Sequence, residues 1–289
     1  MKVENIKFKN GDALLTGKVF LPLDFSQAKG FIIFTHGLGY CAKTYRLDNK
    51  LFANTGYIFC MYNVRGHVGS TGEFATNKAA EDISVIIDTL LDRYKIENKE
   101  MIAMLSHSTG GLISLLASIN DKRIKCGGVI SVVTSMADSF LHWFDSGYIE
   151  KVRDNYRHDG KINPGIEKFL LSKESLNSFK NGIPSKEELS FRDKYGLLRL
   201  PSVYNFFYEI TYSPDIFNYA DRIKIPLILF KGKKDEVIPI TKTDKLYSLL
   251  NCKKRLVETN AIDHFFNNYW PAVEKETLNF FDEIQKSVL

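Results

Sequence analysis

The sequence lacks any long apolar stretch. Its first twelve residues, MKVENIKFKNGD, contain no hydrophobic core of a secretory signal peptide. No later run approaches the roughly 20 consecutive apolar residues that a helix needs to cross a bilayer. We therefore expect neither a signal peptide nor a transmembrane helix, and we predict a cytoplasmic protein.

Residues that form disulfides or metal sites are also scarce. Cys41, Cys60, Cys126 and Cys252 lie far apart with no C-x-x-C pair, and a chain of 289 residues does not need disulfides to be stable. We expect reduced thiols, most of them buried. No group of His, Cys, Asp and Glu has the spacing of metal ligands, and no glycine-rich loop has the form of a phosphate cradle. The sequence therefore indicates no metal and no cofactor.

The charge is not one-sided. The chain has 39 Lys and Arg residues against 34 Asp and Glu residues, a net charge of +5, and the basic residues are spread along it. Because a polyanion usually binds a clustered basic patch, we do not expect nucleic acid as a partner. With 44% hydrophobic residues, the chain can bury a core large enough for one globular domain with an insertion.

Apolar runs and helical segments alternate along the chain. Between two of the runs, Ile83, Ile86, Ile87, Leu90 and Tyr94 repeat with the period of an amphipathic helix. This alternation predicts a mostly parallel sheet with helices on both faces, in which ligands bind beyond the carboxyl ends of the strands. The runs that predict buried strands are residues 31–37, 57–64, 101–108, 127–134 and 226–232.

The alternation stops between residues 135 and 222. This segment has helical patches but no convincing buried strand, and residues 140–219 hold 16 of the chain's aromatic residues. We predict that residues 135–222 form an inserted, mainly helical cap on a core made of residues 1–134 and 223–289. The aromatic rings could fill the cap's own interior or line an apolar substrate site.

The segment MLSHSTGG, residues 104–111, ends a predicted strand and opens a predicted helix. A sharp strand-to-helix turn of the form small-x-Ser-x-Gly holds a serine above the edge of a sheet. Ser108 fits this pattern, with Ser106 and Gly110 at the tight positions. Ser106 is the poorer candidate because Met104 would then occupy a tight position. A serine nucleophile also needs a histidine base and a carboxylate that orients the base.

A carboxylate and a histidine follow two later strands. Asp235 lies just after the run PLILFKG, and His264 lies after the apolar run of a predicted last strand. We predict that Ser108, Asp235 and His264 form a catalytic triad. Glu236 could replace Asp235 as the acid but lies one residue further on, and Asp263 adjoins the histidine. We interpret Glu236 and Asp263 as residues that stabilise their loops.

Acyl transfer also needs N–H donors for the oxyanion that forms when a serine adds to a carbonyl group. We predict the backbone N–H of Thr109 as one donor and the N–H of Leu38, in the loop THGLGY, as the second. Gly39 is the alternative second donor. We interpret His36 as a hydrogen-bonding residue of this loop, and His107 as a neighbour packed against the serine turn.

With these residues, the chain resembles α/β-hydrolases of the group that contains monoglyceride lipases, cinnamoyl and feruloyl esterases, and bacterial acyl-carrier thioesterases. The resemblance covers nearly the whole length outside the predicted cap. The chain departs from the group at Asn63, Val68 and Ser106, where the group often has Asp, Gly and Gly. The segments that carry the resemblance are NGDALLTGKVFLP, the HG pair at 36–37, NVRGHVGSTG at 63–72, which is similar to D-x-R-G-H-G-x-S-x-G, the turn at Ser108, GKKDEVIP and DHFF.

The resemblance implies an α/β-hydrolase fold and a cofactor-free serine hydrolase that cleaves a small-molecule carboxylic ester or thioester through an acyl-enzyme. The alternative within enzymes is a thioesterase or acyltransferase that takes a fatty acyl chain from an acyl carrier, and peptidases and C–C hydrolases share the fold. The alternative outside enzymes is a non-catalytic small-molecule receptor. The residues that we predict to line the substrate site are Gly39, Tyr40, Trp143, Phe144, Tyr204 and Phe207.

Overall fold

A computed structural model describes residues 1–38, 40–67, 69–96, 101–141, 212–261, 263–267 and 269–288. Most of the predicted cap lies outside these ranges. So do five of the residues predicted to line the substrate site, namely Gly39, Trp143, Phe144, Tyr204 and Phe207.

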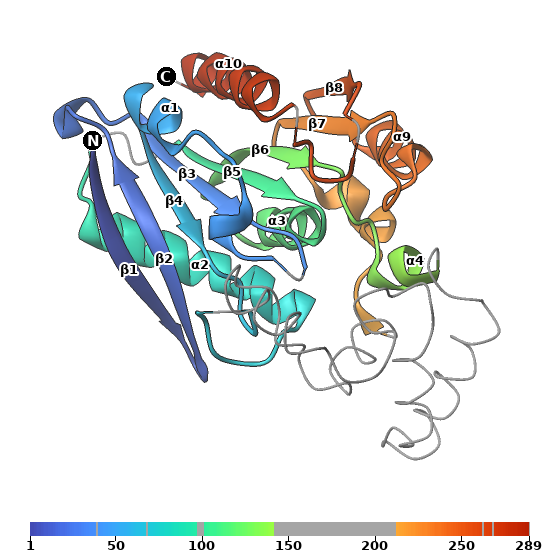
Figure 1. The fold of residues 1–289 in the computed structure, drawn as a ribbon, viewed down its shortest axis with the longest axis horizontal. Helices are drawn as coiled ribbons and strands as arrows, with labels where there is room; N and C mark the ends of the chain where they lie inside the picture. Colours follow the sequence, from blue (N-terminus) through green and yellow to red (C-terminus); the bar gives the residue numbers. More distant parts are fainter. Residues whose placement is uncertain are drawn as a thin grey trace.

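The described chain forms one eight-stranded sheet (Figure 1). The strands are β1 (Lys2–Asn10), β2 (Ala13–Leu21), β3 (Gly30–Thr35), β4 (Tyr57–Tyr62), β5 (Ile102–His107), β6 (Ile124–Ile130), β7 (Leu227–Gly232) and β8 (Lys254–Thr259). They lie in the order β1-β2-β4-β3-β5-β6-β7-β8. β2 pairs antiparallel with β1 and β4, and the other neighbours are parallel. This mostly parallel sheet confirms the predicted fold class.

The largest differences between the observed and the predicted strands are at two places. The antiparallel hairpin of β1 and β2 was not predicted, because β1 is largely exposed and has no continuous apolar run. β6 ends at Ile130, before the predicted end at residue 134. The reason is local: Ser131 adopts a positive φ of 44°, which takes the chain out of the extended conformation.

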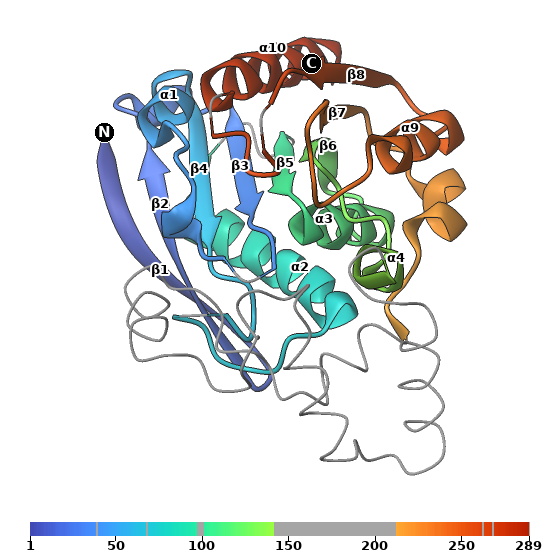
Figure 2. The ribbon, with the colours of Figure 1, turned by 45° about the vertical axis from the view of Figure 1, so that its right-hand side comes forward.

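Helices cover both faces of the sheet, and Figure 2 shows α2 and α3 on the face opposite to α10. The helices are α1 (Asn49–Asn54), α2 (Thr76–Arg93), α3 (Thr109–Asn120), α4 (Met136–Leu141), α9 (Ile240–Leu249) and α10 (Trp270–Val288). Successive side chains of a strand point to opposite faces. In β3, Ile33 therefore packs in the core beneath α2, α3 and α9, whereas Ile32 and Phe34 pack in the core beneath α1 and α10.

The chain segments that lead into and out of the predicted cap lie side by side. Residues 216–222 form a 3-10 helix whose Ile216 and Ala220 are buried in the same core as α2 and α3. The N–H of Ile216 donates to the carbonyl oxygen of Thr134 at 2.8 Å. The last residues of the segment predicted as cap therefore pack onto the core that contains α2 and α3.

The four cysteines are thiols rather than disulfides, and Cys41, Cys60 and Cys126 are buried, as predicted. Burial raises the pKa of the Cys60 and Cys126 thiols, so both stay protonated. None of the helices in the described ranges is both long enough and apolar enough to cross a membrane.

Candidate active site

Ser108 occupies the turn between β5 and α3. Its backbone has a φ of 57° and a ψ of −125°, a positive-φ conformation that costs free energy in any residue other than glycine. The N–H of Ser108 donates to the carbonyl oxygen of Ile130 at 2.9 Å, and the carbonyl oxygen of Ser108 accepts the N–H of Gly111 at 2.9 Å. This is the strained turn that holds a serine hydroxyl above the edge of a sheet.

Glycines let this turn lie directly against the loop that follows β3. A Cβ atom on Gly110 would lie 2.2 Å from the carbonyl oxygen of Thr35 and 2.6 Å from that of His36. A Cβ atom on Gly37 would lie 3.0 Å from the Cβ of Ser108. The first contact is impossible and the second is tighter than side chains normally make, so the sequence pattern HG followed later by Ser-x-Gly reflects close packing of two loops.

Ser106 stands where the resembling group often has glycine, and the structure accommodates it. The residue is fully buried, and its hydroxyl donates to the carbonyl oxygen of Gly128 on β6 at 3.3 Å. The added hydroxyl therefore has an acceptor on the neighbouring strand, away from the reactive face of the turn.

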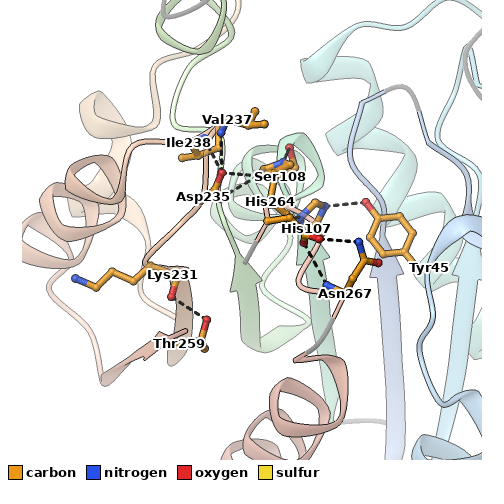
Figure 3. A network of polar contacts seen from close by, with 11 residues as sticks. Tyr45, His107, Ser108, Lys231, Asp235, Val237, Ile238, Thr259, His264 and Asn267 are labelled. Atoms are coloured by element: carbon orange, nitrogen blue, oxygen red, sulfur yellow. Dashed lines mark hydrogen bonds and ion pairs between the residues drawn. The ribbon is translucent and has the colours of Figure 1, made fainter. Parts of the chain in front are cut away.

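Three side chains from separate loops meet beyond the carboxyl ends of the strands (Figure 3). The Nε2 atom of His264 lies 3.0 Å from the Oγ atom of Ser108. The Nδ1 atom of His264 lies 3.0 Å from each carboxylate oxygen of Asp235. A carboxylate can only accept, so Nδ1 carries the imidazole proton and Nε2 is left to accept the Ser108 O–H. The structure thus brings together the three residues predicted as a triad.

Asp235 is held in its ionised form. Its Oδ1 atom accepts the backbone N–H groups of Val237 and Ile238, each at 2.9 Å. Burial favours the neutral acid and raises the pKa of Asp235, but the hydrogen bonds and charge of His264, together with the Ile238 N–H, outweigh burial and lower the pKa overall. A negative charge therefore faces the imidazole at neutral pH.

Glu236 and Asp263, the acidic residues near the triad that the sequence also offered, do not contact His264 in the way that Asp235 does. Glu236 is exposed to solvent. Asp263 accepts the side-chain N–H of Asn267 at 2.9 Å and so stabilises its own loop. Within the described ranges, no group of three or more His, Cys, Asp and Glu side chains is arranged to hold a metal ion.

The two segments predicted to stabilise the oxyanion both adjoin Ser108. Thr109 is the first residue of α3, so its N–H has no acceptor within the helix. Leu38 directly follows Gly37, the residue packed against the Ser108 side chain. Tyr40, predicted to contact substrate, packs against Phe265 with ring centroids 4.7 Å apart and the ring planes tilted by 52°. Leu38 and Thr109 thus lie next to Ser108 or its immediate contact, and Tyr40 packs against the residue that follows His264; their roles remain predictions.

Two buried histidines hold the same loops without carrying charge. The Nδ1–H of His36 donates to the carbonyl oxygen of Gly37 at 2.8 Å, and its Nε2 accepts the N–H of Val64 at 2.9 Å. Burial lowers the pKa of His36 well below its usual range and lowers the pKa of His67 to about 4. His36 is thus a neutral hydrogen-bonding residue of its loop, in line with the interpretation from sequence.

Two residues at the site went unrecognised in the sequence. Tyr45 belongs to none of the patterns considered, yet its hydroxyl lies 2.8 Å from the Nδ1 atom of His107. His107 was interpreted as packing alone. The only sequence feature that pointed to His107 was its position beside Ser108. Its hydrogen-bond partners could not be predicted because they come from segments far away along the chain.

The chain matches known proteins over most of its length. A sequence model of the hydrolase family described as serine aminopeptidase, S33, matches residues 26–266. A solved structure of the α/β-hydrolase GrgF from Penicillium sp. sh18 is 16% identical, with a TM-score of 0.69 over 99% of this chain and 100% of that one. The esterase Pf2001 from Pyrococcus furiosus is 15% identical, with a TM-score of 0.65 over 98% of this chain and 90% of that one.

A third solved structure has the same fold. The enol-lactonase from Burkholderia xenovorans LB400 is 16% identical, with a TM-score of 0.62 over 93% of this chain and 97% of that one. At these identities the structures establish the shared fold, and the match to the family model establishes membership. The chain belongs to the serine aminopeptidase S33 family of α/β-hydrolases, and the family places it among the hydrolases.

Proposed function

We propose that the protein is a serine hydrolase that cleaves carboxylic esters through an acyl-enzyme. The observation that carries this proposal is the unbroken hydrogen-bonded series from Asp235 through His264 to Ser108. A serine hydroxyl is a weak nucleophile until a base accepts its proton, and the base works best when a carboxylate orients it. All three side chains are nearly buried, which strengthens the interactions among them.

In the proposed reaction, Ser108 Oγ adds to the ester carbonyl carbon while the Nε2 atom of His264 accepts the hydroxyl proton. Asp235 stabilises the imidazolium that forms. The N–H groups of Thr109 and Leu38 donate to the oxyanion. His264 then returns the proton to the departing alcohol, and water, deprotonated by the same imidazole, releases the acid from Ser108.

The substrate class follows from two further considerations. The names of two similar structures, an esterase and an enol-lactonase, favour an ester over an amide. The packed rings of Tyr40 and Phe265 supply an aromatic surface beside His264, suited to an apolar acyl or aryl group. We further propose that the cap predicted at residues 135–222 covers this surface with the part that precedes residues 216–222, which return to the core. In this proposal Gly39, with cap rings including Trp143, Phe144, Tyr204 and Phe207, completes the site.

Replacing Ser108 with Ala tests the proposal. Hydrolysis of p-nitrophenyl butyrate should fall by several orders of magnitude, on the order of 10⁶-fold by analogy with serine proteases. The matched control is Ser106→Ala, which removes a buried hydroxyl two residues away that donates to Gly128 instead. A fluorophosphonate probe should label Ser108 in the wild type and nothing in Ser108→Ala. Equal hydrolysis by wild type and Ser108→Ala would overturn the assignment.

The family description favours one second candidate, an aminopeptidase. The same acyl-enzyme chemistry would then act on an N-terminal peptide bond. Comparing hydrolysis of p-nitrophenyl butyrate, an acyl-CoA thioester and an aminoacyl p-nitroanilide distinguishes an esterase, a thioesterase and an aminopeptidase. Folded wild-type protein that hydrolyses none of them and resists the fluorophosphonate would be a receptor rather than an enzyme.

A further inference from the structure

Tyr45 and His107 form a buried hydrogen-bond series that runs across the active site. The hydroxyl of Tyr45 accepts the backbone N–H of Gly37 at 2.8 Å and lies 2.8 Å from the Nδ1 atom of His107. The Nε2 atom of His107 lies 2.8 Å from the backbone carbonyl oxygen of His264. Figure 3 shows Tyr45 and His107 pointing toward each other beside His264.

The chemistry of the four groups sets the direction of every hydrogen bond. A carbonyl oxygen can only accept, so the Nε2 atom of His107 must carry the proton and donate it to His264. The Nδ1 atom is then a bare acceptor and receives the O–H of Tyr45. Because the Tyr45 hydroxyl donates its proton to His107, the lone pairs of its oxygen can accept the N–H of Gly37. Each donor and acceptor in the series has a partner of the opposite kind.

This arrangement persists over the pH range in which the enzyme would be assayed. His107 is completely buried, and burial, followed by repulsion from His264, lowers its pKa to about 3. Burial also raises the pKa of the Tyr45 phenol. Neither group therefore changes its protonation between pH 5 and 9, and the series keeps its direction.

The series joins the loop that carries Gly37 to the loop that carries His264. Acyl transfer requires these two loops to keep a fixed position relative to each other. At one end is Gly37, which precedes the predicted oxyanion donor Leu38. At the other end is the main chain of His264 itself. The Tyr45 ring is in turn fixed by edge contacts with Phe34 and Trp270, at centroid distances of 4.8 and 5.7 Å. A rigid ring therefore sets the distance between the oxyanion loop and the histidine loop.

We propose that Tyr45 and His107 are positioning residues for acyl transfer, which fix the Gly37–Leu38 loop and the His264 main chain relative to Ser108. The proposal rests on the proposed serine hydrolase function. It assigns His107 a neutral positioning role, in contrast to His264, whose imidazole in the proposed reaction takes the proton of Ser108 and returns it to the departing alcohol.

Replacing Tyr45 with Phe is the primary test. The change leaves the Gly37 N–H and the His107 Nδ1 atom without partners while retaining the ring. Because a misplacement of about 1 Å at a reacting group can cost about 100-fold in rate, we expect kcat for p-nitrophenyl butyrate to fall about 10- to 100-fold with KM nearly unchanged. The rate of fluorophosphonate labelling at Ser108 should fall in parallel.

The matched control is Tyr62→Phe. It removes another buried phenol O–H, which pairs with Thr35 at 3.2 Å at the end of β3. A loss of stability alone would affect both variants, so kcat is compared well below the Tm of each. We expect Tyr62→Phe to retain kcat within about twofold.

Two variants of His107 test the two halves of the series and replace Tyr45→Phe if that variant does not fold. In His107→Gln, the amide nitrogen can still donate to His264, and in His107→Asn, the amide oxygen can still accept from Tyr45. Each should retain more activity than His107→Ala, which loses both contacts. Unchanged kcat in Tyr45→Phe, or a rise in KM at constant kcat, would overturn the proposal.

The failure of this proposal is distinguishable from failure of the proposed function. A wild type that labels at Ser108 alongside a fully active Tyr45→Phe variant overturns only the positioning role. If the wild type neither hydrolyses esters nor labels, the serine hydrolase assignment is wrong and the positioning role falls with it. Imidazole ¹⁵N spectra give a readout independent of activity: His107 should be protonated at Nε2 alone from pH 5 to 9, and protonation at Nδ1 would contradict the series.

Discussion

At the scale of single residues, the site depends on a glycine whose position leaves no room for a side chain and on residues held at a positive φ. Gly110, in the first turn of α3, packs against the main chain of Thr35 and His36, and Ser108, two residues earlier, is held at a positive φ. Phe266 shows the same feature after the histidine, with a φ of 56° and a fully buried ring. Buried packing therefore maintains strained backbone on both sides of the Ser108–His264 contact.

Gly110→Ala should impair both folding and catalysis. The new methyl group would meet a backbone oxygen at 2.2 Å, which cannot move aside as a side chain can. We expect a loss of about 1–3 kcal/mol in the free energy of unfolding, as for other overpacked sites. Since the turn would shift, ester hydrolysis should fall by about 100-fold or more.

The control for this variant is Gly111→Ala, one residue further along the same helix. Its methyl group would meet a side-chain atom of Val132 at 2.9 Å rather than main chain. Urea unfolding and p-nitrophenyl butyrate hydrolysis measure the two effects. Equal losses in the two variants would show that crowding at the main chain is not what makes Gly110 necessary.

At the scale of elements, a buried ion pair fixes the loop after β4 to α2. The guanidinium of Arg65 donates to both carboxylate oxygens of Asp82, at 2.6 and 2.7 Å, and both residues are almost completely buried. Asn10, at the end of β1, donates to the same carboxylate at 2.8 Å. The loop that Arg65 anchors also carries Val64, whose N–H donates to His36. The ion pair thus supports the loop next to Ser108 from a distance.

Asp82→Asn should be strongly destabilising. The change removes the buried counter-ion of Arg65 and leaves only the exposed carboxylate of Asp12, 3.8 Å from the guanidinium. Removing one partner of a buried pair typically costs about 3–5 kcal/mol. The matched control is Glu283→Gln, which removes a carboxylate from exposed ion pairs with Lys253 and Arg255 on the protein surface. Chemical denaturation should show a large shift for Asp82→Asn and little for Glu283→Gln. Similar midpoints for the two variants would contradict this role of the ion pair.

At the scale of the whole molecule, the C-terminal helix holds the segment that carries Tyr45. Trp270, the first residue of α10, packs against the Tyr45 ring. One turn later, the carboxyl group of Glu274 accepts the N–H of Asp48, the residue that caps α1, at 2.6 Å. The end of the chain therefore braces a loop more than two hundred residues earlier in the sequence.

Glu274 should make the stability of the protein depend on pH. Burial raises its pKa from 4.5 to about 7, so the folded state binds the proton more tightly than the unfolded state does. The free energy of unfolding should therefore decrease as pH rises from about 4.5 to about 7. Since one pKa unit corresponds to about 1.4 kcal/mol, the decrease is on the order of 3 kcal/mol.

Glu274→Gln removes this titration while its side-chain oxygen can still accept from Asp48. We expect the variant to be more stable than the wild type at pH 8 and similar to it near pH 4.5, as measured by urea unfolding at both values. Glu276→Gln makes the same chemical change at a half-buried position of the same helix and serves as the control. A Glu274→Gln variant with the pH dependence of the wild type would exclude Glu274 as its source.

Local patterns in the sequence were sufficient to predict the five strands β3 to β7 and the three side chains that meet at the edge of the sheet. Buried parallel strands are continuous apolar runs, so β3 to β7 could be located directly. The turn at Ser108 needs small residues at set offsets, and Asp235 and His264 each follow a strand. These features depend only on residues that are close together in the sequence, so they can be recognised without a structure.

Only the tertiary structure decided the contacts between distant residues that belong to no sequence motif. Nothing near Tyr45 in the sequence indicates that its hydroxyl joins Gly37 to His107, and the Arg65–Asp82 pair and the return of Ile216 to the core were equally hidden. The physical reason is that these contacts depend on strand register and on the paths of long loops, which arise when the whole core packs. Residue types are local information, whereas the distances between loops are set by the assembled sheet.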